Sequence, residues 1–375
     1  MRASPMRPTA LFISNIRWNF VWQRHQTLAS LFARDYEVVF CEIPGVRRPE
    51  LRDAGRLWRK LIQRDRSAVF AETIPTHLRI AAPGFLPAIY GVFCASNQIL
   101  VERWLDREID LRKGVDLIVN YSAARTALQL IERIPHKKLV YDCTDDWLAV
   151  RGIPPFLPGD EQRLLQMADL TLVPSRVLLT RKQGGARRCV QLPHGALVDR
   201  FLVPPRGARE AGRLVLLYYG HLHRQHLDFE LLNQIAQARP AWRIILVGPV
   251  KTPYQFPVNV VLQNQVSHDK LREFVQKADV ILLPYTLNRY TEAVMPAKTY
   301  ECLATGRPVV ATPLPELISE LPSQLHYARG LDDWVRSIEQ AVASDSPEAR
   351  EGRIALAKAN SWESRYIRLL ELLKS

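Results

Sequence analysis

The sequence of 375 residues contains few of the features that mark membrane-spanning, secreted or metal-binding proteins. Its most apolar stretch, residues 85–95, is interrupted by Pro87 and falls short of the roughly 20 apolar residues that a helix needs to cross a bilayer. The five cysteines include no Cys-x-x-Cys pair, which favours reduced thiols over a disulfide framework. The nine histidines are scattered, and His221, His223 and His226 have no acidic or thiol partner at ligand spacing. We therefore expect a cytoplasmic protein that uses no metal and no cofactor.

Acidic residues are in deficit, and the deficit is concentrated in the first half of the chain. The formal net charge is +13, with 30 Lys and Arg against 20 Asp and Glu in residues 1–200, but 21 against 18 in residues 201–375. The basic segment, Arg47–Arg66, combines eight basic residues with an apolar stripe at helical spacing. This pattern is typical of a helix that lies on an anionic membrane surface. A surface helix packed on its own domain is the alternative, and both stay open.

Short apolar strands alternate with helical segments and fall into two groups. The first group has expected strands at residues 9–14, 37–42, 117–120, 138–142, 170–174 and 190–193 and helices such as 22–32, 123–134 and 160–168. The second has expected strands at residues 214–219, 242–247, 258–262, 280–284 and 309–311. This alternation predicts two α/β domains with parallel sheets, and a loop rich in Pro and Gly separates them. We expect domains at residues 1–204 and 205–358 and a terminal helix at 359–375.

The segment Thr291–Leu314 provides the strongest functional signal in the chain. Its pattern predicts a helix over residues 297–305, with Pro296 in the first turn and a glycine and a proline at the end. Lys298 would lie near the helix N-terminus, where free backbone N–H groups and the helix dipole favour a phosphate. Glu301 would follow one turn later, where its carboxylate can accept hydrogen bonds from two ribose hydroxyls. The alternative is a solvated Lys/Glu helix in any α/β protein.

This segment resembles the donor-site signature of GT-B glycosyltransferases, particularly the family 4-like bacterial enzymes that build surface polysaccharides. The matching residues are Pro296, Lys298, Glu301, Ala304, Gly306, Pro308, Val309 and Val310. One departure is that Ala293 stands where family 4 has the first of two glutamates, so the inverting or retaining outcome stays open. The resemblance implies two Rossmann-like doubly wound domains facing across a cleft, and a C-terminal helix that crosses back to the first domain.

The predicted donor site is built from loops that follow the strands of the second domain, because ligands of open α/β sheets bind at the carboxyl ends of the strands. Gly220 would let a phosphate approach the backbone and Arg224 would pair with it. By the resemblance, the ends of the next two strands flank the nucleobase, and the segment before the main motif lines the pyrophosphate region. The predicted donor-binding residues are Gly220, His221, Arg224, Gly248, Gln265, Val266, Tyr285, Pro296, Lys298 and Glu301.

A turn in the first domain contains three carboxylates in five residues, Asp142, Asp145 and Asp146. Such crowding favours raised pKa values, and an inverting transferase needs a carboxylate to take the proton of the acceptor hydroxyl. With Tyr141 and Thr144, this turn resembles the Tyr-x-x-Ser-Asp turn that supplies the base in xanthan-type membrane-associated glucuronosyltransferases. Asp145 and Asp142 are therefore the catalytic candidates. The alternative is that Asp142 and Asp146 cap the next segment and bind arginines.

Aromatic and polar residues open the first helix at the matching edge of the first domain. Aromatic faces stack on sugar rings and an arginine binds phosphate, which suits a sugar or lipid-phosphate acceptor. The candidate acceptor-binding residues are Asn15, Trp18, Arg24 and His25. Arg24 and His25 fit equally well as buried helix residues that pair with the aspartate turn.

The leading hypothesis is a glycosyltransferase that moves a sugar from a nucleotide-sugar, with a UDP-sugar favoured over a GDP-sugar, to a lipid-linked or polysaccharide acceptor in bacterial exopolysaccharide biosynthesis. The resemblance and the basic segment place it in the cytoplasm, peripheral to the inner face of the cytoplasmic membrane. A nucleotide-sugar epimerase of the same fold is one alternative. A basic lipid- or nucleic-acid-binding protein is another, but it would explain the charge and not Lys298 with Glu301. We expect no nucleic-acid partner.

Overall fold

The computed structural model describes residues 7–20, 22–45, 73–150, 152–207, 212–250 and 254–374. The chain divides into two compact units, which are described separately. The first unit contains Met1–Leu192 and Leu369–Ser375, and the second unit contains Pro193–Arg368. The basic segment, Arg47–Arg66, lies outside the described residues, so the membrane-bound helix predicted there stays a prediction.

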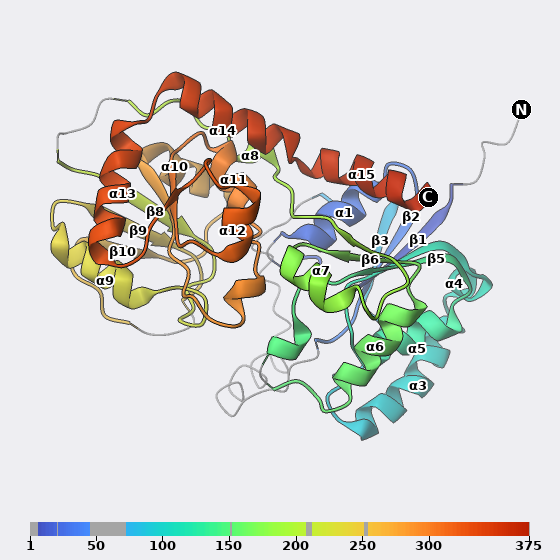
Figure 1. Cartoon of the computed structure of the whole chain (residues 1–375). Coiled ribbons are helices and arrows are strands. Elements are labelled where there is room, and N and C mark those ends of the chain that lie inside the picture. The colour runs from blue at the N-terminus through green and yellow to red at the C-terminus, as the bar shows by residue number, and fades with distance from the viewer. Residues whose placement is uncertain are drawn as a thin grey trace, which may run out of the picture. The chain divides into compact units, whose positions relative to one another are not determined.

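The first unit is a parallel sheet with strand order β3-β2-β1-β4-β5-β6-β7. Its elements are β1 (Thr9–Ser14), α1 (Arg24–Phe32), β2 (Glu37–Glu42), β3 (Leu78–Ala81), α3 (Gly91–Leu105), α4 (Ile109–Lys113), β4 (Val115–Asn120), α5 (Arg125–Arg133), β5 (His136–Asp142), η2 (Trp147–Ala149), α6 (Leu157–Met167), β6 (Leu170–Val173), α7 (Arg176–Lys182) and β7 (Cys189–Gln191). Helices α3, α5 and α6 lie side by side (Figure 1). The strand order reverses between β1 and β4, which is where such sheets bind ligands.

The second unit repeats this architecture with strand order β10-β9-β8-β11-β12-β13, again parallel throughout. Its elements are α8 (Val198–Phe201), β8 (Val215–Tyr219), α9 (Phe229–Ala238), β9 (Arg243–Val247), β10 (Val260–Gln263), α10 (His268–Lys277), β11 (Val280–Leu283), η3 (Thr291–Ala293), α11 (Thr299–Ala304), β12 (Val309–Ala311), α12 (Pro315–Glu320), β13 (His326–Tyr327), α13 (Leu331–Ala343), α14 (Pro347–Ala359) and α15 (Trp362–Lys374). Its strand order reverses between β8 and β11.

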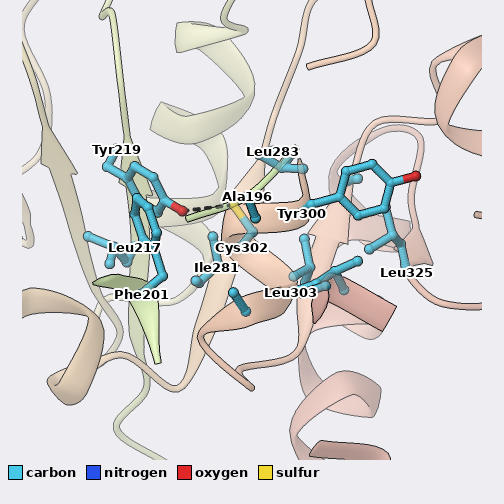
Figure 2. Packing of buried hydrophobic residues seen from close by; sticks show 14 of the residues in the cluster. Ala196, Phe201, Leu217, Tyr219, Ile281, Leu283, Tyr300, Cys302, Leu303 and Leu325 are labelled. Atoms are coloured by element: carbon cyan, nitrogen blue, oxygen red, sulfur yellow. Dashed lines mark hydrogen bonds between the residues drawn. The ribbon is translucent and has the colours of Figure 1, made fainter. Parts of the chain in front are cut away.

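Helices cover both faces of the second sheet, which explains why its strands are almost wholly apolar. On one face Leu217 and Tyr219 belong to a cluster with residues of α8 and α11. There the Tyr219 hydroxyl and the Cys302 sulfur form a hydrogen bond of 3.3 Å (Figure 2). On the other face Leu216 and Tyr218 pack with residues of α9 and α13. The two adjacent tyrosines at the end of β8 therefore enter opposite cores.

The segment that precedes β8 packs on the second unit. Ala196 N donates to Asn360 O at 3.1 Å, and Trp362 N donates back to Ala196 O at 3.1 Å. Arg307, 2% exposed, donates from Nη2 to Pro204 O at 3.1 Å. These contacts explain why the division falls at residues 192–193, before the expected loop.

Helix α15 has residues in both units, because Leu369–Ser375 cluster with the first unit. Arg188 Nη1 donates to Leu372 O at 3.1 Å, and Lys138 Nζ donates to Leu373 O. None of the helices in the described ranges is long and apolar enough to span a bilayer.

Candidate functional site

Lys298 lies at the carboxyl end of β8, at the reversal point of the second sheet. Its Nζ donates to the Tyr219 carbonyl oxygen at 2.6 Å and to the Tyr218 hydroxyl oxygen at 3.0 Å. A Cβ atom at Gly220, where φ is +131°, would lie 2.0 Å from this Nζ. Only glycine therefore accommodates both the backbone conformation and the lysine.

A second glycine brings the neighbouring strand end equally close. Gly248 follows β9 with a φ of +147°, and a Cβ atom there would lie 1.8 Å from Gly220 O. Gly220 N donates to Val247 O at 2.9 Å, so the two strand ends stay paired up to this point. The two glycines thus let the ends of β8 and β9 approach each other closely, with Lys298 Nζ against Gly220, and a backbone without side chains at this point suits a phosphate.

Glu301 lies in the first turn of α11 and is partly buried. Burial raises the pKa of Glu301 to about 7, although the positive charges of Lys298 and Arg200 act in the opposite direction. Its protonation state is therefore poised near neutral pH, and its carboxylate lies close to the lysine. Arg200, from α8, is a neighbour that the sequence did not reveal.

The helix that follows Lys298 is shorter than predicted, over Thr299–Ala304 rather than residues 297–305. Pro296 lies before the helix and not in its first turn, because its carbonyl accepts from Thr299 N at 3.0 Å and from Thr299 Oγ1 at 2.8 Å. These two bonds form a turn that ends at Lys298, the residue immediately before the helix.

Backbone hydrogen bonds tie the loop after β8 to the loops after β9 and β11. Leu222 N donates to Pro249 O at 3.1 Å, and Asp228 N donates to Pro284 O at 3.0 Å. On this loop His221 is partly buried and its carbonyl accepts from the Tyr218 hydroxyl at 3.3 Å. Arg224 is exposed.

The other predicted donor-site residues lie around this loop. The Arg224 guanidinium is 5.2 Å from the centre of the Tyr254 ring. Tyr285, after β11, is buried, which raises its pKa, and the nearby charge of Lys298 opposes that rise. Gln265 and Val266, after β10, are partly buried, and Val266 packs against the core that contains Tyr219. The structure thus groups Gly220, Gly248, Tyr285, Lys298 and Glu301, and their roles in binding stay predictions.

In the first unit, the three carboxylates of the aspartate turn occupy different environments. Asp142 is fully buried, and Arg24 Nε donates to its Oδ2 at 2.7 Å. Burial raises the pKa of Asp142 and the Arg24 charge opposes the rise. Asp146 is also buried, and its Oδ2 accepts from Arg181 Nη1 at 2.5 Å. These two contacts match the structural alternative for Asp142 and Asp146, and they weaken the catalytic assignment of Asp142.

Asp145 is the member of the trio that is partly exposed. The Thr144 hydroxyl donates to its Oδ2 at 3.3 Å. Below the turn, Lys182 Nζ donates to Glu161 Oε2 at 2.7 Å, and Glu161 Oε1 accepts from the Tyr141 hydroxyl at 3.0 Å. This buried network, which lies on α6, α7 and β5 and was not predicted, holds the strand from which the turn departs.

Three of the four predicted acceptor residues lie in the core of the first unit. Trp18, Arg24 and His25 are 5%, 3% and 3% exposed. Arg24 Nη1 donates to Leu192 O at 2.9 Å, and the His25 ring stacks on Tyr121 at 3.8 Å. Their burial favours the interpretation of both as buried helix residues, and Arg24 pairs with the aspartate turn as that interpretation expects, whereas His25 Nδ1 lies 2.8 Å from Ser14 Oγ. Asn15, just after β1, is only partly buried and stays a candidate for acceptor binding.

Among the described residues, no group of three or more His, Cys, Asp or Glu side chains is arranged to hold a metal ion. Metal independence stays a prediction, since the function must be measured to test it.

The fold and the donor motif together match known proteins. Residues 213–344 match the family model described as glycosyl transferases group 1. Sucrose-phosphate synthase from Thermosynechococcus elongatus has the same fold, with a TM-score of 0.71 and 16% identity over 98% of each chain. HepE of Anabaena, in complex with UDP and glucose, has a TM-score of 0.66 and 14% identity, over 98% of this chain and 100% of that one. The family match lies within the second unit, and the likeness to these solved structures over nearly the whole chain confirms the predicted fold.

A curated relative gives a more specific likeness. The chain is similar to TuaH of Bacillus subtilis (strain 168), a glycosyltransferase named for teichuronic acid biosynthesis, with 22% identity over 263 residues. The match covers 62% of this chain and 66% of the relative, a little under two thirds of its length.

Proposed function

We propose that this protein transfers a sugar from a UDP-sugar to a lipid-linked or polysaccharide acceptor of a bacterial surface polysaccharide. The main observation behind the donor assignment is Lys298 Nζ against the Tyr219 carbonyl and Gly220, at the reversal point of the second sheet. The name of TuaH supports a surface-polysaccharide product, and the complex of HepE with UDP and glucose supports the donor class.

In the proposed reaction the second unit stabilises the leaving group. The bond between the anomeric carbon and the UDP oxygen breaks, and UDP leaves with the electron pair. The Lys298 ammonium and the backbone at Gly220 stabilise the charge that develops on the diphosphate, because fixed positive groups are most effective where charge accumulates. The Glu301 carboxylate accepts hydrogen bonds from the ribose hydroxyls. Positive side chains replace a metal in this role, so we expect transfer to continue in the presence of a chelator.

In the inverting version of this reaction, Asp145 takes the proton of the acceptor hydroxyl as its oxygen bonds to the anomeric carbon. The partial exposure of Asp145 supports this role, since Asp142 and Asp146 are buried and paired with arginines. If Asp145 is not the base, the product retains the donor configuration. The anomeric configuration of the product therefore distinguishes the two versions.

The proposed location is the inner face of the cytoplasmic membrane, where a lipid-linked acceptor is found. Exposed apolar side chains at the start of helix α3 and within it support a membrane contact, because Tyr90, Val92 and Ile99 are 46%, 67% and 57% exposed. Exposed apolar side chains near the start of one helix are typical of an interfacial contact. The basic segment would add electrostatic attraction to anionic lipids.

Calorimetric titration with UDP, GDP, ADP and CMP at one fixed salt concentration tests the donor assignment. We expect UDP to bind most tightly and the Lys298→Met variant to bind it at least tenfold more weakly, which corresponds to about 1.4 kcal/mol. If the affinity is the same for all four nucleobases and falls steeply with salt concentration, the proposal is contradicted and a basic lipid- or nucleic-acid-binding protein is favoured. Epimerisation of a UDP-sugar without acceptor would favour the epimerase.

A further inference from the structure

Tyr218 contacts Lys298 but does not belong to the donor motif. Its side chain is 2% exposed and packs in the core formed with α9 and α13, on the face of the sheet opposite to Tyr219. Yet its hydroxyl oxygen accepts from Lys298 Nζ at 3.0 Å, and this Nζ lies 4.3 Å from the centre of the Tyr218 ring. A buried tyrosine therefore contacts the ammonium both through its oxygen and through its π face.

We propose that Tyr218 is a positioning residue that holds the Lys298 ammonium in front of Gly220, ready for the diphosphate of the donor. This inference rests on the proposed function, because it assigns Tyr218 a role in the same donor site. Tyr218 itself does not touch the donor. It acts through Lys298.

The geometry accounts for two of the three protons of the ammonium. An ammonium has three N–H donors. Among the described residues, two are directed to Tyr219 O and Tyr218 Oη. The third remains for a phosphate oxygen placed near Gly220. Because a lysine side chain is long and flexible, fixing it before the ligand arrives reduces the entropy lost on binding.

The surroundings of the Tyr218 hydroxyl also determine in which direction it donates its proton. The hydroxyl donates its proton to His221 O at 3.3 Å, so a lone pair is left to face Lys298. Burial raises the pKa of Tyr218, which keeps the hydroxyl neutral and able to donate. The chain from Lys298 through Tyr218 to His221 thus connects the lysine to the loop that follows β8.

The Tyr218→Phe substitution removes the oxygen and retains the ring, and its effect on ligands with and without phosphate distinguishes positioning from general damage. We expect the affinity for UDP to fall about tenfold, since a hydrogen bond to a charged group is lost. The affinity for uridine should be unchanged, because uridine has no phosphate for Lys298 to bind. Equal losses for UDP and uridine would indicate a structural effect and overturn the proposal.

A matched control is available on the same sheet. Tyr327, on β13, donates from its partly buried hydroxyl to Leu317 O at 2.7 Å and to Leu321 O at 2.8 Å. Strands β11 and β12 separate β13 from β8. Tyr327→Phe also removes a hydroxyl bonded to the backbone, and should leave UDP affinity as in the wild type. A loss of UDP affinity in Tyr327→Phe as large as in Tyr218→Phe would overturn the proposal.

A double-mutant cycle without ligand tests the Tyr218–Lys298 contact itself. Unfolding by denaturant is measured for Tyr218→Phe, Lys298→Met and the double variant. We expect the double variant to lose less stability than the two single variants combined, because each removes the same contact. If the stability losses of the two single variants simply add up in the double variant, the proposed coupling between Tyr218 and Lys298 is overturned.

The same variants separate this inference from the donor site as a whole. If Lys298→Met weakens UDP binding and Tyr218→Phe does not, the donor site stands and the role of Tyr218 fails. If Lys298→Met leaves UDP affinity unchanged, both fail.

Discussion

Lys298 occupies the space that a side chain at Gly220 would need, since a Cβ atom there would lie 2.0 Å from the lysine Nζ. The glycine after β8 and the lysine before α11 are thus two parts of one structural feature. The sequence around either residue alone does not show that the two are in contact. The contact explains why a single site needs both a positive φ with no side chain and a flexible cation.

Gly220→Ala should reduce UDP affinity by at least tenfold and destabilise the protein. The new methyl group would displace Lys298, and the φ of +131° is unfavourable for any residue with a Cβ atom. Titration with UDP and denaturant unfolding measure the two effects. Gly352→Ala is the control, because this glycine lies in α14 with open space around it and alanine favours a helix. Equal UDP affinities for Gly220→Ala and Gly352→Ala would contradict the account.

Glu301 should make donor binding depend on pH. The pKa of Glu301 is raised to about 7 by burial, so in the free protein the carboxylate that would bind the ribose is lost as the pH falls through this value. UDP affinity should therefore decrease between about pH 8 and about pH 6 in the wild type. In Glu301→Gln the affinity should be lower, and its remaining pH dependence should be that of UDP itself.

The same substitution tests the sign of the shift in the absence of ligand. Because the pKa in the folded state lies above the ordinary value of 4.5, the folded protein binds the proton more tightly than the unfolded chain does. This carboxyl therefore lowers the free energy of unfolding as the pH rises from about 4.5 to about 7. That decrease should be smaller in Glu301→Gln. Identical stability profiles would show that Glu301 is not buried as described.

Asp142→Asn should destabilise the first unit by about 3–5 kcal/mol, because it leaves the buried Arg24 charge without its counter-ion. Denaturant unfolding is the measurement. The double variant Arg24→Met/Asp142→Leu should recover part of the loss, since an apolar pair leaves no buried charge. A stable Asp142→Asn variant that lacks transfer activity would instead support the catalytic assignment of Asp142.

Asp145→Asn should leave the fold and UDP affinity intact and reduce transfer by roughly 100-fold or more, as expected for the loss of a general base. Initial rates with saturating donor and acceptor give the comparison. The product of the wild type should then have the inverted anomeric configuration. Full activity in Asp145→Asn excludes it as the base, and the retaining version of the reaction would follow.

Most of the strands were predictable because each contains a short apolar run, and β1, β2 and β12 have the predicted bounds. Strands β3 and β13 were missed, because four residues with an exposed arginine and two residues alone give no such pattern. The start of α11 was misplaced because the hydrogen bonds from Thr299 to Pro296 hold Lys298 in a turn.

The grouping of Gly220, Lys298 and Glu301 could be predicted from the motif in residues 291–314 and from the loop after β8, and their roles in binding stay predictions. Tyr218 could not be predicted, because alternation places its side chain in an apolar core and only the tertiary fold brings Lys298 to its hydroxyl. The Arg24–Asp142 pair joins residues far apart in the chain, so the sequence allowed both a buried pair and two surface residues. The structure shows the buried pair.

A crystal structure of the full chain grown with UDP tests the central claim most directly. The account predicts diphosphate oxygens within hydrogen-bond distance of Lys298 Nζ and of the backbone at Gly220, with the ribose hydroxyls on the Glu301 carboxylate. UDP bound elsewhere, or at this place with its phosphates away from Lys298, would contradict the donor site described here.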